Sequence, residues 1–263
     1  MKLIKTIVIL TVLFVFAGNS YSQTGTDTTK TKKKSSSTKR VYKSYKGCKK
    51  SSGSCTYFEL KYRLIKSGKI NTIINNAIKD SLLAAANIFE DMKASNFTDA
   101  VSNFIAEYDS SLKVQTNGAS WYADINGKPD FNGKNVVSYS IFQSMYTGGA
   151  HPNSYLAYYN YDKRSGNPIT LATLFGTGWE AALNKVIDAD FRKMKGLSAT
   201  DNLQEKAYLF ENKITYTNNF AIEKKGLRFY YNNYEIAPYS TGPTDLFVPW
   251  ADLKGIITDP SYY

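Results

Sequence analysis

The sequence of 263 residues has very few of the side chains that hold metals or carry protons, because it contains one histidine and two cysteines. Zinc hydrolases bind their metal with two or more histidines and a carboxylate, and a structural zinc site needs about four nitrogen or sulfur ligands. The chain offers only His151, Cys48 and Cys55. There is no G-x-S-x-G motif to carry a serine nucleophile and no G-x-x-x-x-G-K-[ST] phosphate loop. We therefore expect no metal site and no cofactor.

Long hydrophobic runs are also scarce, and the clearest one is Thr6–Ala17 near the start of the chain. A membrane-spanning helix needs about 20 apolar residues, so this run is too short to serve as an anchor. Lys2 and Lys5 precede the run and small residues follow it, which is typical of a cleaved signal peptide over residues 1–22. We expect an exported protein, periplasmic, on the cell surface or extracellular, that is not transmembrane after cleavage.

The formal net charge of +11 comes from the first 50 residues. Residues 51–263 contain 21 basic and 21 acidic residues, whereas residues 23–50 contain ten basic residues and one acid. The folded part is therefore neutral and gives no reason to expect specific binding of nucleic acid. Residues 23–50 are rich in Ser, Thr and Lys, which predicts a disordered basic tail. Such a tail is either a solvated spacer or a contact to anionic envelope polymers.

The two cysteines stand close together in "GCKKSSGSC". An even number of cysteines in an exported chain favours a disulfide, so we expect a Cys48–Cys55 bond. A ring this short contributes roughly 2–3 kcal/mol in the loop-entropy description.

Periodic apolar residues predict an α+β fold with mainly antiparallel sheet. Three-to-four spacing indicates a helical hairpin at about 71–112, with Asn71 as a cap of the first helix and Ser95 or Asn96 before the second. A further helix is expected at about 178–195, packed on the sheet. Alternating residues predict strands at 57–65, 119–126, 135–147, 154–162, 218–224, 226–232 and 245–250. The strand predicted at 119–126 is expected to break at Asn126-Gly127.

Two segments of the chain resemble a known family. The segment "SMYTGGAHPNSYLAYYNYDKRSGNPITLATLF" and the later "FAIEKKGLRFYYNNYEIAPYSTGPTDLFVPWADLK" resemble the domain-of-unknown-function family 3298, which includes the extracytoplasmic domain of RsiV anti-sigma factors. Asn233 stands where a proline is usual in that family, and Trp250 where a tyrosine is. Residues 51–130 resemble more loosely the companion family 4163, also found in PdaC-type proteins. We expect residues 131–258 to form the family 3298-like part.

The resemblance implies binding in the cell envelope and does not imply catalysis. The RsiV domain is a sensor of lysozyme, and in PdaC-type proteins the corresponding region precedes a polysaccharide deacetylase domain. We therefore expect a non-catalytic binding module whose partner is a cell-wall glycan or a lysozyme-like protein. Lysozymes of this kind are cationic, so the neutral domain and basic tail do not favour a strong electrostatic attraction to them.

The candidate site lies around the histidine-containing stretch "TGGAHPN" and the later "NYEIAPY". The candidate ligand-binding residues are His151, Asn153, Tyr146, Tyr234, Glu235 and Tyr239. Two interpretations remain open for the histidine. Either His151 and Asn153 fix a tight connection between two strands, or this corner is the rim of a binding site in which Glu235 partners His151. Tyrosine supplies amphipathic contact area at recognition surfaces, and the chain has 21 of them. They could equally coat the solvent face of antiparallel strands.

A cell-wall glycan hydrolase is the alternative function. Such an enzyme needs two carboxyl groups roughly 5 to 10 Å apart, one of them with a raised pKa. Glu235 and Asp245 are the candidates, because both lie near the aromatic segment that contains Tyr234 and Tyr239.

Overall fold

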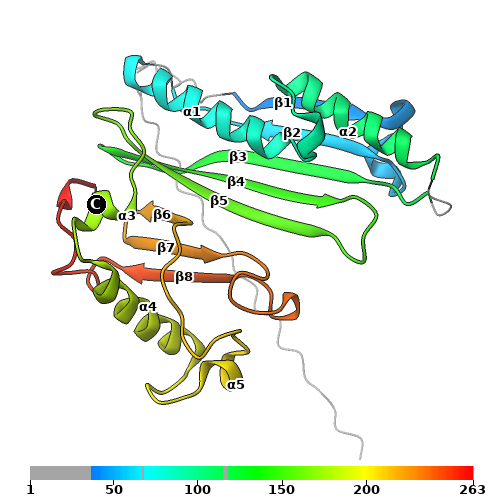
Figure 1. Ribbon diagram of the computed structural model, residues 1–263. Coiled ribbons are helices and arrows are strands. Elements are labelled where there is room, and N and C mark those ends of the chain that lie inside the picture. The colour runs from blue at the N-terminus through cyan, green and yellow to red at the C-terminus, as the bar shows by residue number, and fades with distance from the viewer. Residues whose placement is uncertain (1–36, 67, 115–117, 263) are drawn as a thin grey trace, which may run out of the picture. The chain divides into compact units, whose positions relative to one another are not determined.

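Two β-sheets organise the residues that the computed structural model describes, which are 37–66, 68–114 and 118–262 (Figure 1). The larger sheet has the strand order β1-β2-β3-β4-β5. Its strands are β1 (Lys39–Ser44), β2 (Tyr57–Tyr62), β3 (Tyr122–Asn132), β4 (Val136–Tyr146) and β5 (Asn153–Asp162). Neighbouring strands are antiparallel except β2 and β3, which are parallel. Two helices lie between β2 and β3 in the chain and form the crossover that a parallel pair requires.

These two helices, α1 (Lys69–Ala86) and α2 (Phe97–Ser111), cover one face of the larger sheet (Figure 1). They are the helical hairpin predicted from the apolar spacing. The helix α2 begins after Asn96, whose side-chain oxygen accepts a hydrogen bond of 2.9 Å from the Asp99 amide. The prediction for the start of α1 is wrong, because the helix begins two residues before Asn71. The Asn71 side chain instead donates to the Lys66 carbonyl.

The smaller sheet has the order β6-β7-β8 and packs with the C-terminal helices. Its elements are β6 (Phe220–Glu223), β7 (Gly226–Tyr231) and β8 (Thr244–Pro249), with α3 (Leu171–Phe175), α4 (Glu180–Lys195) and α5 (Leu203–Ala207). The predicted helix at 178–195 corresponds to α4, whose buried stripe is Leu183, Ile187 and Phe191. This stripe shares one hydrophobic core with the buried side chains of β6, β7 and β8.

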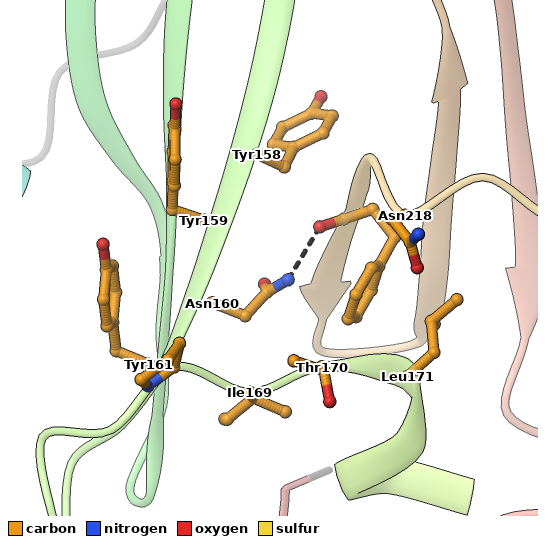
Figure 2. Close-up of a pocket in the computed structure, with 10 residues that line it drawn as sticks. Tyr158, Tyr159, Asn160, Tyr161, Ile169, Thr170, Leu171 and Asn218 are labelled. Atoms are coloured by element: carbon orange, nitrogen blue, oxygen red, sulfur yellow. Dashed lines mark hydrogen bonds between the residues drawn. The ribbon is translucent and has the colours of Figure 1, made fainter. Parts of the chain in front are cut away.

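Buried polar side chains join the two sheets. Ser138 on β4 donates to the Ile222 carbonyl at 2.7 Å. Asn160 on β5 donates to the Phe220 carbonyl at 2.7 Å (Figure 2). The Ile222 amide in turn donates to the side-chain oxygens of Ser138 and Asn160. The edge of β6 is therefore satisfied by side chains and not by another strand. Because Ser138 is fully buried and Asn160 is 4% exposed, these hydrogen bonds are protected from water.

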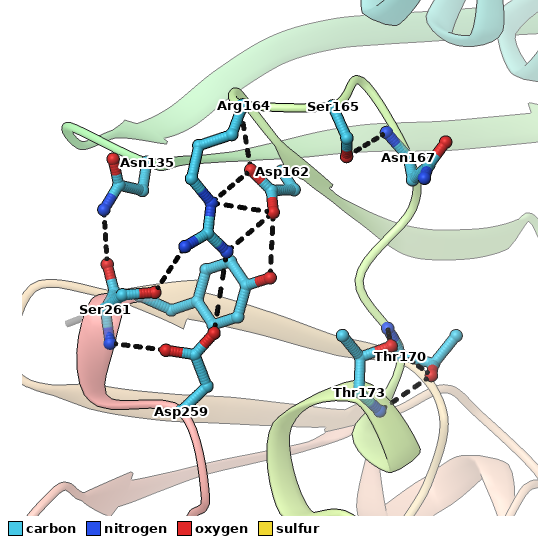
Figure 3. A network of polar contacts seen from close by, with 10 residues as sticks. Asn135, Asp162, Arg164, Ser165, Asn167, Thr170, Thr173, Asp259 and Ser261 are labelled. Carbon is cyan, nitrogen blue, oxygen red and sulfur yellow. Dashed lines mark hydrogen bonds and ion pairs between the residues drawn. The ribbon is translucent and has the colours of Figure 1, made fainter.

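The last residues of the chain are tied to the turn after β5 (Figure 3). Asp162 accepts hydrogen bonds from the Arg164 guanidinium and from the Tyr262 hydroxyl, the latter at 3.0 Å. Arg164 also donates to the Ser261 hydroxyl at 2.9 Å and lies 3.5 Å from Asp259. The hydrogen bonds from Arg164 lower the pKa of Asp162, since they outweigh the effect of its burial. This network holds the C-terminal segment against the larger sheet.

Two further sequence-based expectations need correction. The tail predicted over residues 23–50 includes the strand β1, because Val41 packs against the core and Tyr42 stacks on Tyr57. The rest of that tail and the signal peptide at 1–22 lie outside the described residues. The strand predicted to break at Asn126-Gly127 continues as β3 to Asn132. Gly127 faces the core there, and a Cβ atom on it would lie 2.5 Å from the Tyr139 hydroxyl. The glycine is a site of close packing and not a turn.

The architecture is α+β with mainly antiparallel sheet, as the sequence predicted. The described residues build two hydrophobic cores. One lies between the larger sheet and α1 and α2, and its fully buried residues fall between Phe58 and Tyr161. The other contains Val136 of β4 and buried residues between Ile169 and Tyr262. The boundary predicted between residues 130 and 131 falls inside β3.

Candidate functional site

The histidine corner connects β4 to β5 through residues 147–152. Gly148 has a φ of +93° there, a conformation that favours glycine. His151 is exposed, and its Nδ1 atom lies 2.9 Å from the Pro152 carbonyl oxygen. The side-chain oxygen of Asn153 accepts a hydrogen bond from the next amide, that of Ser154, at 3.0 Å. Both polar side chains therefore make only short-range hydrogen bonds within the described residues.

The corner meets the segment that follows β7. The ring of His151 stacks on Tyr239 with a centroid separation of 4.0 Å and an interplanar angle of 23°. The Tyr239 hydroxyl donates to the Pro152 carbonyl at 3.0 Å, and its ring lies 5.7 Å from that of Tyr234. The structure thus brings three of the sequence-derived candidates, His151, Tyr234 and Tyr239, into one aromatic group. The group is held by contacts between segments about 85 residues apart.

Glu235 does not pair with His151, so that expectation is wrong. Its carboxylate accepts hydrogen bonds from the Asn232 backbone amide at 2.9 Å and from the Asn232 side-chain amide at 3.2 Å. The intervening Tyr234 has a φ of +67°, which turns the chain so that Glu235 folds back onto Asn232. A bulky side chain in this conformation is uncommon and is held by its surroundings.

Glu235 instead lines a small pocket of about 220 Å³, which we call the Glu235 pocket. The residues that line it are Phe210, Glu211, Lys213, Ile214, Thr215, Glu235 and Ile236. Two backbone segments form its walls, and the Phe210 amide joins them by donating to the Ile236 carbonyl at 2.9 Å. Phe210 and Tyr234 are 49% and 56% exposed, which is high for aromatic side chains. The pocket therefore combines two carboxylates, those of Glu211 and Glu235, with an aromatic rim formed by Phe210 and by Tyr234, the residue before Glu235.

The negative charge of Glu235 affects the pKa of two tyrosines. Burial, followed by the negative charge of Glu235, raises the pKa of Tyr155 and of Tyr231. Tyr231 donates from its hydroxyl to the Thr215 carbonyl at 2.6 Å, on the wall of the Glu235 pocket. Both phenols stay protonated at neutral pH and keep their capacity to donate hydrogen bonds.

Asp245, the second acid considered for a hydrolase, lies on β8 in an ion pair. Its carboxylate accepts a hydrogen bond of 2.7 Å from Arg228, which also pairs with Glu223. Asp245 and Glu235 are thus held by different partners, a guanidinium in one case and the amides of Asn232 in the other.

The remaining candidate, Tyr146, belongs to a different surface. On the face of the larger sheet opposite α1 and α2, the rings of Tyr42, Tyr57, Tyr122 and Tyr146 follow one another across four adjacent strands. Successive centroids are 6.2, 6.1 and 6.5 Å apart, with interplanar angles of 25°, 18° and 31°. We call these four residues the tyrosine row. The sequence pattern missed it, because the row depends on strand register and Tyr42 was assigned to the tail.

A charged cluster lies beside the tyrosine row. The side chain of Glu59 is 4% exposed and is contacted by Arg40, Lys50 and Lys61 at 2.6, 2.8 and 2.9 Å. Burial would raise the pKa of Glu59, but hydrogen bonds from Lys50, Lys61 and Arg40 outweigh it and lower the pKa to about 2. Lys50 also binds Asp124 and lies 4.4 Å from the centre of the Tyr57 ring.

The disulfide between Cys48 and Cys55 is present, as predicted. It closes a loop that contains the short 3-10 turn Lys50–Ser52, and so restricts the position of Lys50 above Tyr57. Disulfides form in oxidising compartments, so the bond is compatible with an exported protein.

A second, mainly apolar pocket of about 180 Å³ lies where the two sheets meet (Figure 2). Tyr158, Tyr161, Ile169 and Leu171 contribute to its lining. Its buried polar group, Asn160, already binds the β6 backbone, so the polar chemistry of this pocket serves to join the sheets.

The described residues contain no group of three or more His, Cys, Asp or Glu side chains placed to hold a metal ion. Within the same ranges, every helix is too short or too polar to cross a membrane.

The two sheets define an α+β protein with two cores, and two segments of the chain match known families. Residues 172–251 match the family described as "Protein of unknown function (DUF3298)", and residues 48–154 match the family described as "Deacetylase PdaC". The chain therefore carries a DUF3298 domain preceded by a PdaC-like domain, which confirms the resemblance seen in the sequence.

Solved structures of DUF3298 proteins share the fold. A member from Bacteroides fragilis superimposes with a TM-score of 0.67 at 22% identity, covering 86% of this chain and 94% of its own. A DUF3298 protein from Pseudomonas aeruginosa PAO1 gives a TM-score of 0.67 at 18% identity, covering 87% and 96%. At these identities the likeness concerns the fold alone.

The curated relatives are mycobacterial. Immunogenic protein MPT64 of Mycobacterium tuberculosis and immunogenic protein MPB64 of Mycobacterium bovis are each 27% identical over 131 residues. The match covers 48% of this chain, and it spans about half the length of these relatives, 53%.

Proposed function

We propose that this protein is an exported, non-catalytic binding module of the cell envelope, and that the Glu235 pocket with its aromatic rim binds an envelope glycan. The observation that carries the proposal is that the histidine corner stacks on Tyr239 next to Tyr234, the residue that precedes Glu235 of this pocket. Exposed aromatic side chains offer apolar faces to sugar rings, and the Glu235 carboxylate can accept hydrogen bonds from sugar hydroxyls.

The arrangement of the two acids supports binding over hydrolysis. A glycosidase needs one carboxyl group to supply a proton and a second to act as base or nucleophile across the scissile bond. Asp245 is paired with Arg228, and Glu235 accepts hydrogen bonds from the two amides of Asn232. Each carboxylate thus accepts hydrogen bonds from a partner within the protein.

The experiment measures binding of a neutral N-acetylglucosamine tetramer to the mature protein by isothermal titration calorimetry. We expect Tyr239→Ala and Tyr234→Ala to weaken binding at least tenfold, because each removes a ring of the aromatic group. Met194→Ala on α4, where Met194 is 44% exposed, is the matched control for loss of an exposed side chain. Thermal melting of each variant checks that the fold is intact.

Three outcomes decide between the functions. Unchanged affinity in folded Tyr239→Ala, or no binding by the wild type, would overturn the glycan proposal. Titration with a hen-type lysozyme tests the other partner expected from the sequence. Release of reducing ends from a longer glycan that is lost in Glu235→Gln would establish the hydrolase instead.

A further inference from the structure

The tyrosine row lies on the face of the larger sheet that α1 and α2 leave uncovered. Side chains alternate between the two faces of a strand. Phe58 and Ala123 are buried in the core beneath the helices, so their neighbours Tyr57 and Tyr122 project from the opposite face. The strands that carry the row, β1 to β4, lie side by side in that order (Figure 1). All four tyrosines are partly exposed.

Exposed cations outnumber exposed acids along this row. The cations Arg40, Lys50 and Lys61 have side chains 52%, 41% and 45% exposed, whereas Glu59, to which all three bind, is 4% exposed. Arg40 contacts Glu59 through Nε, with its guanidinium carbon 4.4 Å from the centre of the Tyr42 ring. A ligand that reaches this surface therefore meets three ammonium or guanidinium groups, while the acid beneath them is shielded.

We propose that the tyrosine row is a second binding surface, and that its ligand is an acidic polysaccharide. Sugar rings lie along the tyrosines, and the carboxylate groups of the polymer bind Arg40, Lys50 and Lys61. Charge complementarity supports this occupant, because the exposed cations flank an aromatic strip that runs across four strands.

An exposed acid lies beside the row. Asp124 accepts a hydrogen bond of 2.6 Å from the Tyr57 hydroxyl and has a side chain 36% exposed. A polysaccharide can place a hydroxyl group at this position and donate to the carboxylate.

The test measures binding of the full mature protein to polygalacturonate by biolayer interferometry at low and high NaCl, with neutral dextran and single-stranded oligo-dT as comparison polymers. We expect binding to polygalacturonate that weakens with salt, and little binding to dextran. Tyr122→Ala should weaken it at least tenfold at low salt. Arg40→Gln and Lys61→Gln should each weaken it roughly three- to tenfold and reduce its salt dependence.

Two control variants remove exposed side chains that lie outside the tyrosine row. Tyr208→Ala removes a tyrosine that is 67% exposed outside the row, and Lys254→Gln removes an exposed cation elsewhere. Neither should change the affinity. Tyr42→Ala, on the edge strand β1, is the second variant if Tyr122→Ala does not fold.

The proposal is overturned if folded Tyr122→Ala and Tyr42→Ala bind polygalacturonate like the wild type, because the lysine-rich tail then accounts for the binding. It is also overturned if oligo-dT binds as tightly and with the same dependence on Tyr122. The tyrosine row shares no residue with the Glu235 pocket or its aromatic group, so loss of tetramer binding in Tyr239→Ala neither supports nor weakens this proposal.

Discussion

Protonation of Glu59 should remove a measurable part of the stability of the larger sheet. Three cations hold this buried carboxylate and lower its pKa from 4.5 to about 2. A depressed pKa in the folded state stabilises the protein above the pKa of the unfolded chain, and this contribution is lost as the pH falls from about 4.5 toward 2. The full shift corresponds to about 3 kcal/mol.

The expected effect is smaller than this limit, since the three cations are about half exposed and solvent screens them. A contribution of about 1–3 kcal/mol remains. The assay is urea unfolding of oxidised wild type and Glu59→Gln between pH 2 and pH 6. The difference in the free energy of unfolding should be largest at pH 6 and should shrink by about 1–3 kcal/mol as the pH falls to 2.

Glu211→Gln is the matched control for this prediction. Glu211 pairs with Lys213 at 3.0 Å, but its side chain is 66% exposed, so its contribution should be below about 0.5 kcal/mol at every pH. If the difference between wild type and Glu59→Gln does not depend on pH, the three cations do not stabilise the charged form, and the reasoning fails.

Three further substitutions test the packing. Gly127→Ala should destabilise the fold by about 1–3 kcal/mol, because the new methyl group would overlap the Tyr139 hydroxyl; urea unfolding measures it, and a neutral effect would contradict the close approach. Asn160→Ala should cost about 2–3 kcal/mol by leaving buried backbone groups of β6 without partners, with a loss of two-state behaviour if the sheets separate. Replacing Cys48 and Cys55 together with serine should lower the free energy of unfolding by about 2.5 kcal/mol, and unchanged thermal melting would refute a stabilising role for the disulfide.

Elements whose signal is local were predicted well from the sequence. The apolar stripe of α2 and its Asn96 cap are contained in one short segment, and the alternation in β4 and β5 shows which side chains share a face. The element β1 was missed because its residues carry the basic composition of the tail before them. The strand β1 forms because it pairs with β2, and composition alone gives no information on strand pairing. Gly127 was misread for the same reason, since the neighbours that require a glycine come from α1 and β4.

In the candidate site, too, features that depend on contacts between distant segments were harder to predict than local ones. The binding-rim interpretation, one of two left open, placed His151 beside the segment that contains Tyr239, and the structure stacks the two rings. The partner of Glu235 could not be derived, because it depends on the left-handed conformation of Tyr234. The tyrosine row requires the relative register of four strands, two of them paired in parallel across an intervening helical hairpin. Single-sequence periodicity contains no information on that register.

Asparagine side chains link sheet edges to the proposed site. The outer edge of β5 would expose backbone groups that invite pairing with another chain. Asn232 covers it by accepting from the Leu156 amide at 2.7 Å and donating to the Leu156 carbonyl at 3.1 Å. The same residue binds both carboxylate oxygens of Glu235. Because Asn232 is 5% exposed, its amide cannot rotate freely between these partners. The position of Glu235 in its pocket is therefore set by the edge of the larger sheet, so Asn232 is a positioning residue for the proposed glycan site. Any change that shifts β5 should also move that carboxylate.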